Sequence, residues 1–109
     1  MRSSNSFIFD EIDAGVSGKT ARKIGIKMLS LAKKTQIFCV THSAQIASLA
    51  DEHLLIKKKT YNESTETEIR SLSEEGRIAE LSRILGGINV TEAQRRAAAD
   101  MLSERTSYL

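Results

Sequence analysis

Three carboxylates follow a short apolar run near the start of the chain. Asp10, Glu11 and Asp13 come directly after Phe7-Ile8-Phe9. Carboxylates this close repel one another unless they are solvated or hold a cation. Mg²⁺ suits them, because it binds one or two carboxylates, often through water, and shares its other ligand positions with substrate phosphates. The pattern fits nucleotide hydrolysis, in which one acid holds the metal and the next polarises water; a solvated turn is the alternative.

A histidine stands in the equivalent place after a second apolar run. Residues 36–40, QIFCV, end in Thr41-His42-Ser43. A lone histidine there can simply start a helix and bond to its own turn. In open parallel sheets, however, ligands bind beyond the carboxyl ends of the strands. If the two runs are neighbouring strands, Asp10 and Glu11 converge with His42, which favours a role for His42 in the site.

The stretch from Asp13 to Thr20, DAGVSGKT, ends like a phosphate-binding loop. That loop requires glycine at its first position, and this sequence has Asp13 there. The acids would also face the polyphosphate that such a loop cradles, an electrostatic mismatch unless a metal intervenes. Lys19 and Thr20 are therefore predicted to form the first turn of a helix, with Ser17 as its cap.

The periodicity along the chain predicts an α/β fold of parallel strands with a crossover helix, then edge strands and two C-terminal helices. The apolar run 7–9 and residues 36–40 are predicted strands, buried on both faces. The apolar stripe of the helix between them consists of Ala21, Ile24, Met28 and Leu31. One long helix cannot cover both faces of a buried sheet, so more chain is expected against it.

The second half of the chain contains weaker strands and two more helices. Residues 44–51 show a short helical pattern, and 53–60 and 65–72 alternate like a hairpin or two edge strands. The run Lys57-Lys58-Lys59 suits either nucleic-acid phosphates or a solvated edge strand. Beyond it, Ile78, Leu81 and Leu85 indicate a helix that stops at Gly86-Gly87, and Thr91 with Gln94 forms a capping box for a last helix.

Composition limits the possible classes of protein. The chain has 109 residues and a formal net charge of +2, which predicts one domain at most and gives no bulk argument for nucleic acid or membrane. No stretch is long and apolar enough to span a bilayer. A lone Cys39 and a polar start without a signal region predict the reducing cytoplasm.

Four segments together resemble a known family. They are residues 7–18 (FIFDEIDAGVSG), 36–51 (QIFCVTHSAQIASLAD), 77–87 (RIAELSRILGG) and 90–102 (VTEAQRRAAADML). In this order and spacing they resemble the C-terminal part of the bacterial RecN DNA-repair ATPases, which are relatives of the structural-maintenance-of-chromosomes (SMC) and ABC-type ATPases. The resemblance runs from about Ser6 to Leu102. It implies the C-terminal part of a P-loop NTPase head.

The resemblance also implies roles for individual residues. Asp10 would be the Walker B aspartate of the Mg²⁺ shell, Glu11 the glutamate that activates the attacking water, and His42 the switch histidine that senses the γ-phosphate. Ala14 to Ser17 would be the D-loop at the interface of two heads, where Ala14, Gly15 and Ser17, with Asp10, are expected to contact the nucleotide.

The family's Walker A loop and Ser-Gly-Gly signature lie upstream of Walker B, and neither motif occurs in this sequence; its coiled coil is missing too. Residues 1–109 are therefore expected to form a single incomplete domain, the C-terminal lobe of a head. ATP and Mg²⁺ would then require the missing N-terminal lobe, and this chain alone is expected to be inactive.

The family implies repair of DNA double-strand breaks by recombination in the bacterial cytoplasm, at the nucleoid. The implied partners are the N-terminal lobe, a second head in a homodimer, and DNA through the complete protein, with no membrane. Two alternatives stay open from the residues. One is a freestanding, non-catalytic interaction module that docks by its sheet edge or by residues 15–18. The other is an independent Mg²⁺-dependent phosphohydrolase, which lacks a second carboxylate cluster.

Overall fold

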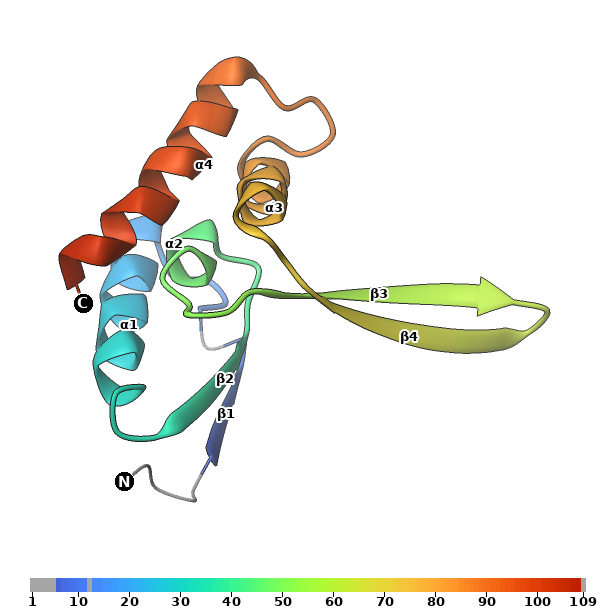
Figure 1. Ribbon diagram of the computed structural model, residues 1–109, viewed down its shortest axis with the longest axis horizontal. Coiled ribbons are helices and arrows are strands. Elements are labelled where there is room, and N and C mark those ends of the chain that lie inside the picture. The colour runs from blue at the N-terminus through green and yellow to red at the C-terminus, as the bar shows by residue number, and fades with distance from the viewer. Residues whose placement is uncertain (1–5, 12, 109) are drawn as a thin grey trace.

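The computed structural model describes residues 6–11 and 13–108, in an α/β arrangement of two small sheets and several helices (Figure 1). Residue 12 of the carboxylate stretch lies outside the described residues. None of the helices in the described ranges is long and apolar enough to cross a bilayer. The elements, in chain order, are β1 (Ser6–Asp10), α1 (Gly18–Leu31), β2 (Gln36–Val40), α2 (Ala44–Ala47), β3 (Leu54–Tyr61), β4 (Ser64–Ser71), α3 (Glu74–Gly86), α4 (Glu92–Glu104) and a final 3₁₀ turn (Arg105–Tyr108).

The first half forms the predicted strand–helix–strand unit. β1 pairs in parallel with β2, in a register that sets Ser6 opposite Gln36 and Asp10 opposite Val40. α1 connects the two strands and begins at Ser17, whose hydroxyl accepts a hydrogen bond from the Thr20 amide. The crossover helix, its cap and the parallel pairing are confirmed.

The second half also follows the predicted order. β3 and β4 form an antiparallel hairpin that extends away from the helices (Figure 1). Its two-residue turn, Asn62-Glu63, has positive φ at both positions, the conformation that matches the twist of a hairpin. Lys57 and Lys59 are exposed on β3 opposite Glu68 and Glu66. Helices α3 and α4 pack together, and the capping box at the start of α4 is present.

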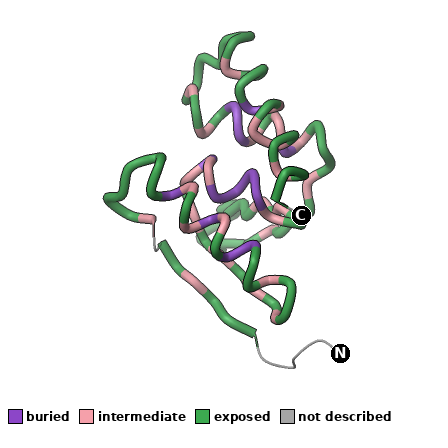
Figure 2. Tube along the Cα trace, turned by 90° about the vertical axis from the view of Figure 1, so that its left-hand side faces the viewer, coloured by how far each residue is buried: buried purple, intermediate pink, exposed green. Residues whose placement is uncertain are grey.

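The short helix α2 contributes to both apolar clusters of the fold. In one cluster, Ala44 and Ala47 pack with Leu81 of α3 and Ala98 of α4. In the other, Ile46 packs with Ala21 and Met28 of α1, against Phe9, Ile24, Ile37 and Cys39. Figure 2 shows the buried residues concentrated in the interior segments of the trace. A β-carbon on Gly25 of α1 would lie 2.8 Å from Leu49 Cδ1, so α1 and the end of α2 approach closely.

The prediction that both strands are buried on both faces is wrong for these residues. The side chains that face α1, such as Phe9 and Ile37, are half-buried, whereas Ile8 is 75% exposed, Phe38 43% and Val40 44%. Leu31, predicted for the buried stripe of α1, is also exposed, because it is the last residue of the helix. The physical reason on the sheet is that α1 covers only one face of a two-stranded sheet.

Two arginines from the C-terminal part of the chain bind the end of α2. The buried Arg77 of α3 donates Nη2 to the carbonyls of Ala47, Ser48 and Ala50, the nearest at 2.8 Å. Arg105 donates Nε to the Leu49 carbonyl at 3.1 Å and also pairs with Asp51. A helix end leaves carbonyls without partners inside the helix, and here guanidinium groups satisfy them. α2 is thereby fixed to the C-terminal helices.

We expect Arg77→Met to lower the free energy of unfolding by about 3 kcal/mol, because a buried carbonyl left without a donor costs roughly 1–3 kcal/mol. Urea unfolding of the 109-residue chain, followed by circular dichroism, measures the loss. Arg83→Met is the matched control on the same helix, since Arg83 is exposed and, within residues 6–11 and 13–108, its side chain pairs with Glu80 alone. It should cost less than about 1 kcal/mol. Equal losses in the two variants would contradict the role given to Arg77.

His53 makes folding sensitive to acid. Its Nδ1 is buried and has no hydrogen-bond partner within the described ranges. Burial, reinforced by the positive charge of Arg77, lowers the pKa of His53 below its ordinary value. The unfolded chain then binds a proton that the folded chain does not. The free energy of unfolding therefore keeps its full value above pH about 6.5 and decreases as the pH falls below that value.

We expect the free energy of unfolding to fall between pH 7.5 and 5.5, and the His53→Gln variant to show a flatter profile. Urea unfolding across that pH range measures both. His42→Gln, which replaces the other histidine of the sequence, is the control and should retain the slope because His53 remains. A slope that disappears in the control and persists in His53→Gln would refute this origin.

Candidate functional site

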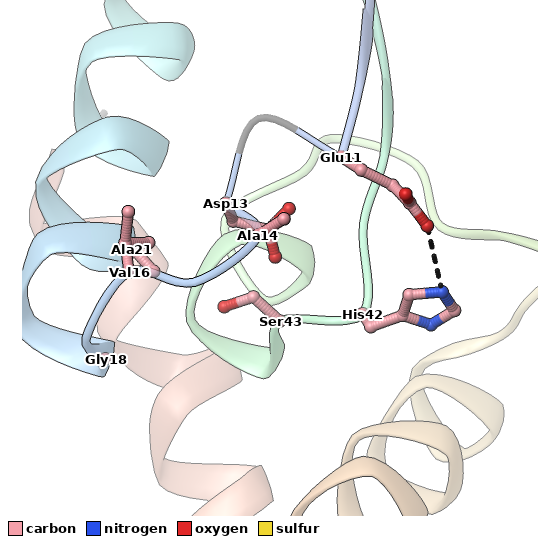
Figure 3. A pocket seen from close by; sticks show the side chains of 8 residues that line it. All are labelled: Glu11, Asp13, Ala14, Val16, Gly18, Ala21, His42 and Ser43. Atoms are coloured by element: carbon pink, nitrogen blue, oxygen red, sulfur yellow. Dashed lines mark ion pairs between the residues drawn. The ribbon is translucent and has the colours of Figure 1, made fainter.

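The carboxyl ends of β1 and β2 bring the two predicted catalytic side chains together. Glu11 follows β1 and His42 follows β2, one and two residues beyond the last paired positions, Asp10 and Val40. Glu11 Oε1 lies 3.5 Å from His42 Nε2 (Figure 3). Both side chains are more than half exposed, so they face a surface at which a ligand could bind.

Glu11 is the point at which the chain leaves the sheet. Its amide still donates to the Val40 carbonyl at 2.9 Å, which continues the strand ladder, while its own carbonyl accepts from the Ala14 amide at 3.1 Å. Both bonds together require an abrupt turn, and Glu11 adopts it with φ of 53°. A positive φ is uncommon for a residue other than glycine and costs roughly 1–3 kcal/mol. The backbone strain therefore falls on the predicted water-activating residue.

The loop from Asp13 to Ser17 is folded by short-range bonds and one side-chain bond. The Val16 amide donates to the Asp13 carbonyl at 3.2 Å, and Gly15 has φ of 78° with open space around it. The Asp13 carboxylate accepts a hydrogen bond of 2.7 Å from the Thr41 hydroxyl. Ala14, Gly15 and Ser17, the predicted nucleotide contacts, are all exposed along this loop.

An open depression of about 340 Å³ lies between this loop and the start of α2. Figure 3 shows Glu11 and His42 pointing toward each other, with Asp13, Ala14 and Ser43 beside them. Val16, Gly18 and Ala21 complete the lining. Of the predicted residues, Glu11, Ala14 and His42 line this depression, whereas Asp10, Gly15 and Ser17 are not part of its lining.

The carboxylates do not form a closed metal centre. Among residues 6–11 and 13–108 there is no group of three or more His, Cys, Asp or Glu side chains that could hold a metal ion. The exposed Asp10 carboxylate at the end of β1 fits the weaker requirement of Mg²⁺, which takes one or two carboxylates and completes its octahedron with water and phosphate oxygens. Nearby, burial and then the charges of Asp13 and Asp10 raise the pKa of the Cys39 thiol.

Sequence reasoning missed the bond between Thr41 and Asp13. The predicted parallel pairing carried the signal, because residues 11–13 and 41–43 follow strands that end side by side. The turn at Glu11 decides which of these side chains bond to each other. That turn depends on the positive φ of Glu11, which the residue type does not predict.

We expect Gly15→Ala to lower the free energy of unfolding by about 1 kcal/mol, because an L-residue with a β-carbon is disfavoured at positive φ. The matched control is Gly18→Ala at the first position of α1, where a β-carbon would meet only Gln45 Cγ at 4.0 Å. Alanine favours a helix, so the control should be neutral or slightly stabilising. Equal stability of the two variants in urea unfolding would show that the loop has a different conformation.

Curated proteins similar to this chain match it over most of its length. No protein-family model matches the chain. Three curated relatives are the DNA repair proteins RecN of Halalkalibacterium halodurans, Bacillus subtilis and Vibrio cholerae, which are 38%, 38% and 43% identical to it. These matches cover 94%, 91% and 89% of this chain, but the chain spans only 18%, 17% and 18% of the relatives.

The fold has a solved counterpart. A structure from work on ATP-driven dimerization and DNA-stimulated activation of SMC ATPases superposes with a TM-score of 0.60 at 20% identity. The match covers 77% of this chain and 50% of that one. The predicted fold class is therefore confirmed. Together with the sequence identities over about nine tenths of its length, this shows that the chain belongs to the RecN family.

Proposed function

We propose that residues 1–109 form the C-terminal lobe of a RecN-type ATPase head that acts in the repair of DNA double-strand breaks by recombination. The observation that carries the proposal is the approach of Glu11 Oε1 to His42 Nε2, 3.5 Å apart at the ends of two parallel strands. The RecN relatives, which are named as DNA repair proteins, support the assignment to repair.

The side chains at the strand ends divide the chemistry of ATP hydrolysis between them. Asp10 would hold Mg²⁺ through water, and the bound metal would neutralise charge on the β- and γ-phosphates. Glu11 would orient the attacking water and accept its proton, a contribution of roughly 10²- to 10⁴-fold in rate. His42, on the other side of the gap, would donate a hydrogen bond to the γ-phosphate and report its presence.

The exposed loop Ala14–Ser17 would lie at the interface with a second head. It projects beyond the strand ends next to the Glu11–His42 pair, so a partner that contacts it also covers the site. In this proposal the active unit is a homodimer of heads in the bacterial cytoplasm, at the nucleoid. DNA is bound through the complete protein, and the SMC counterpart, named for DNA-stimulated activation, supports that expectation.

An N-terminal lobe supplies the groups that these residues lack. The sequence contains no Gly-x-x-x-x-Gly-Lys-Ser/Thr loop to grip the phosphates, so the 109-residue chain alone should bind ATP poorly. The exposed apolar face of the β1–β2 sheet, formed by Ile8, Phe38 and Val40, is the surface on which that lobe would pack. Parallel sheets are normally covered on both faces, which supports this placement.

The decisive experiment uses a chimera in which this chain replaces the matching segment of Bacillus subtilis RecN. We expect the chimera to hydrolyse ATP and the Glu11→Gln chimera to lose about 10²- to 10⁴-fold in kcat while it still binds ATP, because only proton acceptance is removed. Steady-state ATPase assays and binding of a fluorescent ATP analogue measure the two properties.

Glu66→Gln, an exposed position on the hairpin, is the matched control and should leave kcat unchanged. Full turnover by the Glu11→Gln chimera would refute the role of Glu11. An unsubstituted chimera that folds and binds ATP without turnover would instead favour the freestanding interaction module.

A further inference from the structure

The Thr41 hydroxyl joins the two loops of the site. It donates to the Asp13 carboxylate at 2.7 Å and accepts from the Ser43 amide at 2.9 Å. A hydroxyl has one proton to donate and can accept in return, so both bonds form at once. Asp13 and Thr41 are 28 positions apart in sequence. The bond between them therefore ties the loop after β1 to the turn after β2.

The Thr41 bond to Ser43 closes the turn that contains His42. The His42 ring is 86% exposed, and its one interaction within the described residues is with Glu11. Nothing packed around the ring holds it in place, so its direction depends on the backbone of residues 41–43. Ser43 is the N-cap of α2 but makes no side-chain capping bond. Thr41 provides the side-chain bond that orders this turn.

Asp13 connects the same turn to the loop predicted to meet a second head. Its carbonyl accepts from the Val16 amide at 3.2 Å, inside the stretch Ala14–Ser17, while its carboxylate holds Thr41. The carboxylate is partly buried, and a charge-assisted hydrogen bond in such a place is stronger than one between neutral groups. A shift of the loop would thus move Thr41 and, with it, the turn that aims His42.

We propose that Asp13 and Thr41 are positioning residues that aim His42 at Glu11 and couple this alignment to the interface loop Ala14–Ser17. The inference rests on the proposed function for its consequence in catalysis, but the geometric part stands on this chain alone. Contact of a second head with the loop would then set the alignment of the histidine through one hydroxyl group.

The geometric part is tested on the 109-residue chain by amide hydrogen exchange. Thr41→Val keeps the shape of the side chain but removes the acceptor, so we expect the Ser43 amide to exchange about tenfold faster, as for the loss of one hydrogen bond. Thr41→Ser restores the hydroxyl and should restore protection. Thr67→Val, the same change on the exposed hairpin, should leave Ser43 unaffected. Unchanged protection in Thr41→Val would overturn the proposal.

The catalytic consequence is tested in the Bacillus subtilis RecN chimera. Thr41→Val should lower kcat by about tenfold or more with little change in KM for ATP, because a misaimed group costs rate and the phosphate-gripping loop lies elsewhere. Asp13→Ala should do the same, whereas Thr41→Ser and Asp13→Asn, which keep the donor and an acceptor, should recover most of the rate.

The outcomes separate the inference from the proposed function. An unsubstituted chimera without ATPase activity rejects the proposed function, while the exchange experiment still decides the geometry. An active chimera whose kcat is unchanged by Thr41→Val, or whose KM and kcat fall together with the folded fraction, overturns the positioning role. Loss of kcat in Thr41→Val at an unchanged folded fraction, with recovery in Thr41→Ser, supports it, because the rate then depends on the hydroxyl and not on the amount of folded protein.

Discussion

The packing of one short helix, Ala44–Ala47, holds the fold together. A single helical turn is unstable by itself, because nucleation fixes many dihedral angles for one hydrogen bond. Here it is stabilised by its position between two apolar clusters, one with α1 and one with α3 and α4. Arg77 and Arg105 satisfy its terminal carbonyls. Without this element, the strand–helix–strand unit and the C-terminal helices would share few contacts.

The same helix begins at Ala44, two residues after His42, so the buried core and the candidate site share one element. Its C-terminal end is held by arginines, and its N-terminal end by the Thr41 turn, which in turn reaches Asp13. The backbone at the exposed His42 is thus held in place by its connection to the buried helix α2. This arrangement suits the role proposed for His42, which requires a side chain that is exposed to a phosphate and yet accurately placed.

The exposed face of the β1–β2 sheet differs in chemistry from the exposed β3–β4 hairpin. Ile8, Phe38 and Val40 form part of a parallel sheet, which is stable when helices cover both faces. The hairpin carries lysines opposite glutamates on one of its faces, a pattern that discourages further strand pairing. The uncovered face of the parallel sheet is therefore apolar and suits the proposed packing of another lobe, whereas the lysine–glutamate face of the hairpin is charged and exposed.

The sequence by itself determined the elements and, within the candidate site, the two side chains that face each other, Glu11 and His42. Apolar periodicity, the caps at Ser17 and Thr91 and the Gly86-Gly87 stop are local signals, and the strand ends marked Glu11 and His42 because parallel strands end on one side. The sequence also indicated that one helix could not cover a sheet buried on both faces, as the exposed Ile8 shows.

Only the tertiary structure decided the contacts that no local rule fixes. The left-handed turn at Glu11, the bond from Thr41 to Asp13 and the capping of α2 by Arg77 each join or redirect segments through the geometry of the whole chain. Residue types allow many partners for a hydroxyl or a guanidinium. The choice among them follows from packing, which brings together residues that are 28 and 30 positions apart in the sequence. Packing of this kind cannot be read from spacing alone.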